Sequence, residues 1–257
     1  MLMRFAGQHP FIFVANTKAA STSIEQSRLS AIADIRVTVA AVGKHMPLES
    51  VLSRFAFVWE QRPFEDFLSF AVMRDPLDWV SSWYRFHSRP ELAAPGARGQ
   101  EQHAGGLTFD EYWERNREGH HLQPQARRLE VAGAAASLTY LATYETLRTD
   151  LDLLAEVLAL PSLRVGVLNR SKERRAKAAA PTPHTLQQIR EHYQRDYELI
   201  GEREVRNAAG LERYAARDRA SALALSATAL PTSTVEALRW RVLSLRNALL
   251  SAIFPRR

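Results

Sequence analysis

The residues with the clearest chemical potential are a lysine and three hydroxyl side chains that follow a short apolar run. Residues 11–15 are apolar and predict a buried strand, and Lys18 follows them closely. Ala19 and Ala20 then lead into residues 21–23, Ser-Thr-Ser, where we expect a helix to begin. Small side chains let a backbone close around a phosphate, and the N–H groups at a helix N-terminus favour negative charge. The segment therefore predicts either a phosphate cradle or an ordinary turn capped by a hydroxyl.

A second group of this kind follows the apolar run at residues 67–73. Arg74-Asp75-Pro76 comes directly after this predicted strand, and a helical pattern covers residues 76–87. Asp75 suits the cap of that helix, and Ser82 lies two turns into it. A guanidinium and a hydroxyl placed in this way can bind a phosphate. The alternative is a surface arginine paired with Asp78.

Together the two segments resemble the donor-binding motifs of sulfotransferases that use 3′-phosphoadenosine-5′-phosphosulfate (PAPS). The order Lys18, two small residues, then Ser-Thr-Ser is similar to the 5′-phosphosulfate loop, although Thr17 stands where the usual form has proline. The order strand, Arg74, Asp-Pro, helix, with Ser82 eight residues on, resembles the 3′-phosphate motif. The resemblance implies PAPS as co-substrate and no metal. It implies these donor-binding residues: Thr17, Lys18, Ala20, Ser21, Thr22, Ser23, Arg74 and Ser82.

Weaker similarities extend from about residue 10 to residue 200. His121-Leu-Gln-Pro-Gln125 is similar to an element of carbohydrate sulfotransferases, and this likeness implies acceptor contacts for His121 and Gln125. Residues 143–147, 168–171 and 193–198 also resemble segments of the family. The implied reaction moves a sulfuryl group from PAPS to a hydroxyl of a carbohydrate or a similar acceptor, as in the bacterial type of these enzymes.

Catalysis of this transfer requires a cation at the leaving phosphate and a base at the acceptor hydroxyl. Lys18 is the expected cation. His45 is the expected base, because it follows a predicted strand at 35–40 and relatives carry a Lys-His pair near this place. The alternative is that His45 merely flanks a helix. His121 is the second choice, and Glu25 and Glu49 remain open.

Alternating apolar runs and helical patterns predict an α/β fold. We expect strands at 11–16, 35–40, 67–73 and 137–144, and helices at 21–31, 48–55, 76–87, 108–117, 147–160 and 185–201. The resemblance implies a P-loop-like three-layer sandwich with a central parallel sheet flanked by helices. We expect this domain to span residues 1–204, with a helical C-terminal extension at 205–257. The Gly- and Pro-containing segment 88–107 predicts a loop, and residues 88–130 are expected to shape the acceptor pocket.

Composition narrows the class of protein. The 257 residues include no cysteine, which excludes disulfides and thiolate metal sites. No apolar stretch reaches membrane-spanning length, and we expect a cytoplasmic protein. The formal net charge of +6 favours anionic ligands, such as a nucleotide donor or an acidic glycan. Zinc-finger spacing and RNA-binding aromatic motifs are lacking in the sequence, so no nucleic acid partner is expected.

Two segments keep more than one interpretation. The basic run at 170–177 predicts either a solvated loop or a lid over an anion. Apolar residues recur at steps of three and four through 232–257. This spacing predicts a helix. The helix would pack on its own domain, join copies of the chain in a homo-oligomer, or lie on a membrane surface.

Two other functions remain open for the whole chain. One is a noncatalytic nucleotide-binding or self-assembling protein on the same fold. The other is a P-loop phosphotransferase, which is disfavoured because the sequence has no Walker A motif and no clear Mg²⁺-binding aspartate after a strand.

Overall fold

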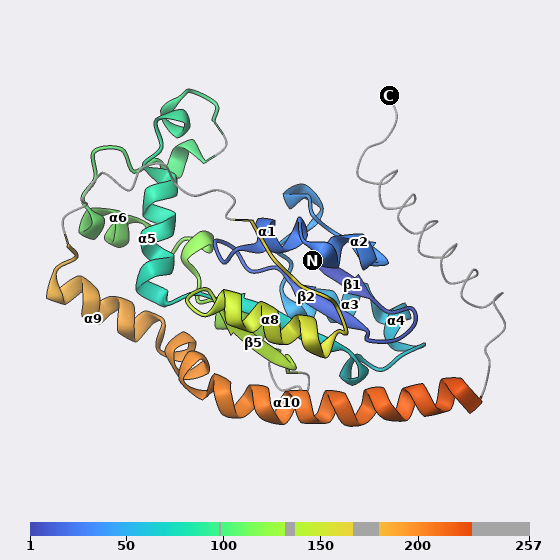
Figure 1. Cartoon of the computed structure of the whole chain (residues 1–257). Coiled ribbons are helices and arrows are strands. Elements are labelled where there is room, and N and C mark those ends of the chain that lie inside the picture. Colours follow the sequence, from blue (N-terminus) through green and yellow to red (C-terminus); the bar gives the residue numbers. More distant parts are fainter. Residues whose placement is uncertain (98, 132–136, 167–179, 228–257) are drawn as a thin grey trace, which may run out of the picture.

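A five-stranded mixed sheet forms the centre of the protein (Figure 1). The computed structural model describes residues 1–97, 99–131, 137–166 and 180–227. The strands lie in the order β3-β1-β2-β4-β5. Strands β2, β4 and β5 are parallel, whereas β1 is antiparallel to both β2 and β3. Their bounds are β1 Leu2–Arg4, β2 Phe11–Val14, β3 Ile35–Arg36, β4 Leu68–Met73 and β5 Tyr140–Thr143.

Helices connect the strands and cover the sheet. None of those in the described ranges is long and apolar enough to cross a membrane. Short 3₁₀ turns occupy several of the connections. The α-helices are α1 Ser21–Glu25, α2 Arg28–Ile32, α3 Leu48–Arg54, α4 Ala56–Trp59, α5 Pro76–His87, α6 Phe109–Asn116, α7 Ala126–Leu129, α8 Leu147–Val157, α9 Pro183–His192 and α10 Gln194–Ala227.

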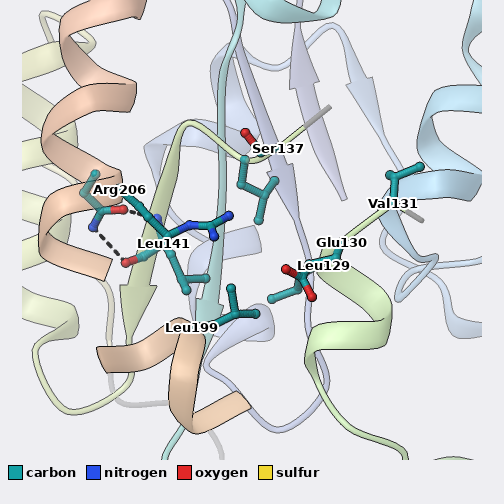
Figure 2. Close-up of a pocket in the computed structure, with 9 residues that line it drawn as sticks. Leu129, Glu130, Val131, Ser137, Leu141, Leu199 and Arg206 are labelled. Atoms are coloured by element: carbon teal, nitrogen blue, oxygen red, sulfur yellow. Dashed lines mark hydrogen bonds between the residues drawn. The ribbon is translucent and has the colours of Figure 1, made fainter. Parts of the chain in front are cut away.

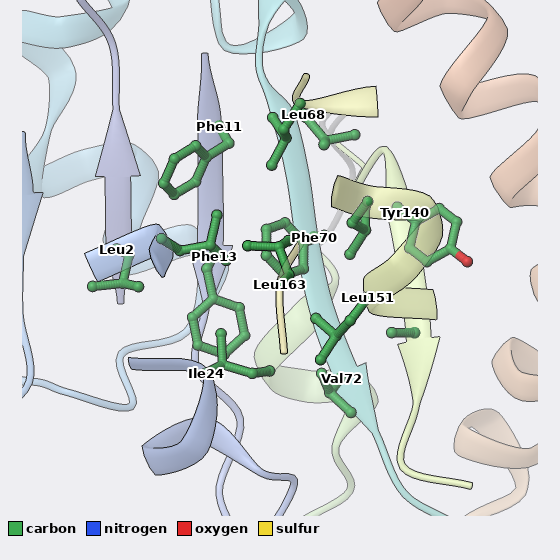
Figure 3. Packing of buried hydrophobic residues seen from close by; sticks show 14 of the residues in the cluster. Leu2, Phe11, Phe13, Ile24, Leu68, Phe70, Val72, Tyr140, Leu151 and Leu163 are labelled. Atoms are coloured by element: carbon green, nitrogen blue, oxygen red, sulfur yellow. The ribbon is translucent and has the colours of Figure 1, made fainter. Parts of the chain in front are cut away.

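Alternate residues of the strands face opposite sides of the sheet, and each side has its own apolar core. Phe13 and Phe70 on neighbouring strands have ring centroids 5.2 Å apart and pack with Ile24 of α1 and Leu151 of α8 (Figure 3). On the other face, Ile12 and its neighbours pack against helices α3, α4 and α7. Because helices cover both faces, every residue of β2, β4 and β5 is buried, as parallel strands require.

The sheet is mixed rather than wholly parallel because of β1, a strand of which the sequence gives little sign. This strand is only three residues long, and the chain turns back at once to β2 through Gly7 and His9, which both have positive φ. The expected strand at 35–40 is reduced to the two residues of β3. Since β1 is antiparallel to both β2 and β3, these two strands point the same way. Their carboxyl ends therefore lie on the same edge of the sheet.

Two of the expected helices are broken in the structure. The helix expected at 21–31 is broken at Ser27, whose hydroxyl donates to the Ile24 carbonyl at 2.6 Å and accepts from the Leu29 N–H at 3.3 Å. Serine competes for backbone groups in this way, and here it ends α1 and caps α2. The expected helix end at Gly201 is wrong, because Gly201 lies inside α10. The break comes instead at Tyr193.

Helix α10 covers the free edge of β5. The Asn207 amide donates to the Leu141 carbonyl at 3.0 Å and accepts from the Leu141 N–H at 2.7 Å, so it takes the place of a neighbouring strand. Gly210 lies directly against Thr139. The helix is continuous through the expected domain boundary after residue 204. The helix expected at 232–257 lies outside the described residues.

Replacing Gly210 with alanine is expected to lower the free energy of unfolding by about 1–3 kcal/mol, the usual range for overpacking a core. The added Cβ would overlap the Thr139 carbonyl oxygen, which belongs to backbone that cannot easily move. Gly201→Ala is the matched control in the same helix, because a Cβ there meets nothing within 4 Å. It is expected to raise stability by up to about 1 kcal/mol through helix propensity. Urea denaturation measures both, and equal midpoints would contradict the predicted contact.

Candidate active site

A large cavity opens at the edge of the sheet where β2, β3, β4 and β5 end. Its volume is about 820 Å³, within the range of roughly 300–1,000 Å³ that is usual for small-molecule sites. The cavity brings together the lysine loop, the start of α1, the residue after β4 and parts of α5 and α8. Eight of the eleven predicted site residues line it: Lys18, Ala20, Ser21, Thr22, Ser23, His45, Arg74 and Ser82.

The loop between β2 and α1 has an unusual backbone. Lys18 and Ala20 both have left-handed conformations, with φ of 55° and 56°. Non-glycine residues rarely adopt this conformation, and such residues are concentrated at functional sites. The loop leads into α1, whose start has no side-chain cap. The N–H groups of its first turn have no acceptor within the helix, so they are suited to an anion.

Thr22 is oriented by a second lysine. The Lys44 ammonium donates to the Thr22 hydroxyl oxygen at 3.1 Å and forms an ion pair with Glu25 at 2.6 Å. Because the hydroxyl oxygen already accepts a hydrogen bond, its own hydrogen is left to donate toward the cavity. Glu25, which remained open as a base, is held by this ion pair and is buried.

The Lys18 ammonium lies among aromatic rings and other cations. Its Nζ is 4.2 Å from the ring centroid of Phe86 and 5.3 Å from that of Trp83. Burial, together with the nearby Arg89, Arg74 and Arg85, lowers the pKa of Lys18 to about 8. Among the described residues no carboxylate lies within 4.0 Å of Lys18. A bound anion would supply the missing negative charge.

Arg74 follows β4 and is mostly buried, with 13% of its side chain exposed. Its guanidinium lies 4.3 Å from the ring centroid of Tyr144, and its Nη2 is 3.8 Å from the Asp78 carboxylate. The pairing with Asp78, the alternative interpretation, is therefore present, although the Asp78 side chain is 59% exposed and such exposed pairs contribute little to stability. The Arg74 Nε is buried and has no hydrogen-bond partner. Buried polar groups are almost always paired, so the unpaired Nε favours a ligand that accepts a hydrogen bond from it.

Gln125 does not line the cavity. It is fully buried, and its amide accepts from Asn16 Nδ2 at 2.9 Å and from the Arg74 N–H at 3.1 Å. The same amide donates to the Arg74 carbonyl at 2.8 Å and to Asp196 at 3.3 Å. Its hydrogen-bonding capacity is thereby filled. In place of the predicted acceptor contact, Gln125 holds the ends of β2 and β4 in register beside the cavity.

His45 lines the cavity and has a defined tautomer. Its Nδ1 lies 2.9 Å from the Ala15 carbonyl oxygen, which can only accept, so Nδ1 carries the hydrogen. The lone pair is then on Nε2. Burial lowers the pKa of His45 to about 4, a shift that the Ala15 hydrogen bond opposes and nearby Lys44 increases. The imidazole is therefore neutral at pH 7, as a base must be.

Two other predicted residues, His121 and Thr17, do not line the cavity. The His121 Nε2 is 3.4 Å from the Tyr112 hydroxyl, and the His121 ring packs against Trp83 and His87. The Thr17 carbonyl accepts from the Trp79 indole at 2.8 Å, whereas the Thr17 hydroxyl is buried without a partner. His121 packs on Trp83, which contacts Lys18, but neither His121 nor Thr17 lines the cavity.

Several cavity residues were not among the predicted ones. Tyr144 follows β5, and the rule that placed Lys18 and Arg74 at strand ends would also have indicated it. The others carry no motif and come from helices and loops. Those with aromatic or charged side chains are Phe86, Arg89, Arg148, Asp152 and Arg164. The segment 168–171, which resembles part of the sulfotransferase family, and the basic run 170–177 lie outside the described residues.

A second pocket lies on the other side of β5 (Figure 2). Its volume is about 150 Å³, and Leu129, Leu141 and Leu199 contribute much of its wall. Dashed lines in Figure 2 mark the two hydrogen bonds between Asn207 and Leu141. None of the predicted site residues lines this pocket, which is small and lies next to the core.

Among the described residues that line it, the large cavity thus combines five cationic side chains with a single carboxylate, that of Asp152. Such a lining suits a ligand with several negative charges. In comparisons with known proteins, no family model, no curated protein and no solved structure matches this chain.

Proposed function

We propose that this chain is a PAPS-dependent sulfotransferase with a P-loop-like three-layer sandwich fold. One observation carries the proposal. Lys18 with its loop, and Arg74 with Ser82, are predicted from separate motifs to bind the two phosphorylated ends of PAPS, and both groups line the same cavity. The parallel arrangement of β2, β4 and β5, with helices on both faces, supports the fold.

In this proposal the two groups bind different parts of the donor. Lys18 and the first-turn N–H groups of α1 bind the 5′-phosphosulfate. Arg74 and Ser82 bind the 3′-phosphate, for which the buried and unpartnered Arg74 Nε is a ready donor. The apolar side chains of Leu147, Leu151, Leu163 and Val165 line another part of the wall, where they offer a surface for the adenine ring.

The reaction is an in-line displacement at sulfur. The acceptor oxygen forms the new S–O bond while the bond from sulfur to the bridging oxygen breaks. The electron pair of the broken bond stays on the 5′-phosphate, where Lys18 stabilises it. His45 Nε2 takes the proton of the acceptor hydroxyl, and the Ala15 carbonyl steadies the resulting imidazolium through Nδ1.

The proposed acceptor is a hydroxyl of a carbohydrate or a similar molecule. This part of the proposal rests on the His121–Gln125 resemblance alone, because neither of those side chains lines the cavity. A transfer assay with ³⁵S-labelled PAPS and separate pools of glycans, lipids and phenols tests it. Label in the glycan pool alone supports a carbohydrate acceptor, whereas label in another pool contradicts it.

Binding of 3′-phosphoadenosine-5′-phosphate (PAP) tests the donor site directly. We expect tight binding of PAP without metal and none of ATP with Mg²⁺, as measured by isothermal titration calorimetry. Arg74→Ala is expected to weaken PAP binding by about 1.5–3 kcal/mol, the range for a hydrogen bond to a charged group. The matched control is Arg213→Ala, which removes the same charge from an exposed position on α10.

Three outcomes would contradict the proposal in different ways. Binding of ATP with Mg²⁺ in preference to PAP would favour a phosphotransferase. Binding of PAP without transfer to any pool would favour a noncatalytic nucleotide-binding protein. Equal PAP affinities for Arg74→Ala and Arg213→Ala would refute the 3′-phosphate contact.

A further inference from the structure

Arg89 lies just beyond the end of α5 and lines the cavity close to Lys18. Its guanidinium carbon is 5.0 Å from the ring centroid of Phe86, the same ring over which the Lys18 ammonium lies at 4.2 Å. One aromatic side chain thus contacts both cations. Stacking on a ring fixes the plane of a guanidinium while leaving its N–H edge available. Neither of the two motifs predicts a role for this arginine.

The charges around Phe86 are not balanced by any carboxylate of the described residues. No carboxylate in the described part of the chain lies within 4.0 Å of Arg89, as is also true of Lys18. Among the nearby cations, Arg89 has a larger effect than Arg74 or Arg85 in lowering the pKa of Lys18. Like charges near each other in a partly buried site repel, and an anion bound in the cavity beside them reduces this cost.

The remaining cations of the cavity are Arg148 and Arg164, which come from other segments of the chain. Arg148 belongs to α8, a short distance along the chain from Tyr144, on which Arg74 stacks. Arg164 is next to Leu163 and Val165 in the wall assigned to the nucleoside. The donor carries three anionic groups. Arg74 and Lys18 account for the two phosphates, which leaves the sulfuryl group for the cation nearest Lys18.

We infer that Arg89, held on the Phe86 ring, forms with Lys18 a binding subsite for the sulfuryl group of the donor. This inference rests on the proposed function. During transfer, Arg89 stays on the sulfuryl oxygens while the S–O bond to the 5′-phosphate breaks and the bond to the acceptor oxygen forms. Lys18 stabilises the negative charge that develops on the departing phosphate. Arg89 thereby acts on the group that moves, whereas Arg74 acts on a group that does not react.

A comparison of two ligands isolates this contact, since PAP is the donor without its sulfuryl group. For Arg89→Ala we expect the Kd for PAPS, measured by calorimetry without acceptor, to rise at least tenfold. The Kd for PAP should stay within twofold of that of the unaltered protein. Transfer should fall by about two orders of magnitude, as for loss of one transition-state donor. Arg89→Lys keeps the charge but lacks the planar guanidinium. Its Kd for PAPS and its transfer rate should lie between those of the unaltered protein and those of Arg89→Ala.

The outcomes separate this inference from the proposed function. Equal weakening of PAPS and PAP would overturn it, since Arg89 would then act on the nucleotide in general, and so would unchanged affinities for both. The control Arg213→Ala removes one distant charge and should alter neither Kd. If the unaltered protein binds neither ligand, the proposed function fails and this inference fails with it. If it binds PAP and PAPS but Arg89→Ala does not distinguish them, only this inference fails. Thermal melting confirms that Arg89→Ala, in an irregular segment, is folded.

Discussion

Replacing Lys18 with alanine is expected to lower the rate of sulfuryl transfer by about two to three orders of magnitude while the protein stays folded. Lys18 is the cation at the start of the donor loop, and the substitution removes the charge that stabilises the leaving phosphate. Alanine fits the left-handed backbone at this position no worse than lysine does, because both carry a Cβ. Initial rates with labelled PAPS measure the effect, and circular dichroism checks the fold.

A contrast with Lys18→Arg tests the charge itself. Lys18 in the free protein has a pKa of about 8, so it is charged below that pH and becomes neutral above it. Binding of PAP should therefore weaken as the pH rises from 7 to 9. Arginine remains charged throughout this range, so the affinity of Lys18→Arg for PAP should be flat. Transfer by Lys18→Ala within tenfold of the unaltered protein would show that Lys18 does not have this role.

Elements with strong local signals were predictable from the sequence. Helix α5 has the expected bounds because Asp75 accepts from the Asp78 N–H at 3.1 Å and Pro76 fits the first turn. Helix α6 begins at a complete capping box, in which Thr108 and Glu111 exchange hydrogen bonds. In both cases the decisive contacts lie within three or four residues along the chain. Local sequence is sufficient for such elements.

Elements determined by distant contacts were not predictable in the same way. Strand β1 exists because Leu2 and Met3 pair with β2 on one side and β3 on the other. Helix α10 continues through Gly201 because Asn207 and Gly210 pack against β5 far upstream in the sequence. A glycine inside a helix costs only about 1 kcal/mol, which such packing readily offsets.

The residues of the site also divide into those that the sequence predicts and those that depend on distant contacts. Lys18, His45 and Arg74 were placed together because each follows a strand that ends at one edge of the sheet, and this rule needs only the topology. The position of Gln125 depends on Asp196, which is 71 residues away and accepts from its backbone N–H at 2.9 Å. Arg89 lies in an irregular segment whose path no periodicity reveals. The positions of such side chains can be known only from the folded structure.

The second large effect is expected at His45. His45→Asn should lower kcat by about two to four orders of magnitude, the usual contribution of a general base. The asparagine amide nitrogen can take the place of Nδ1 and keep the hydrogen bond to the Ala15 carbonyl, while the lone pair of Nε2 is lost. Donor binding should therefore be unchanged, and the loss should appear in kcat rather than in the Kd for PAP.

His121→Asn is the informative comparison, because His121 is the second candidate for the base. It packs against Trp83 and does not line the cavity, so its replacement should leave kcat within tenfold. The reverse pattern, with His121→Asn inactive and His45→Asn active, would transfer the role to His121 and leave His45 as a support for the Ala15 turn. The pH profile gives a further check. His45 in the free protein has a pKa of about 4, so acid should reduce kcat/KM only as the pH falls toward that value. The negative donor raises the pKa of a nearby imidazole, so kcat of the loaded enzyme should decline at a higher pH than kcat/KM does.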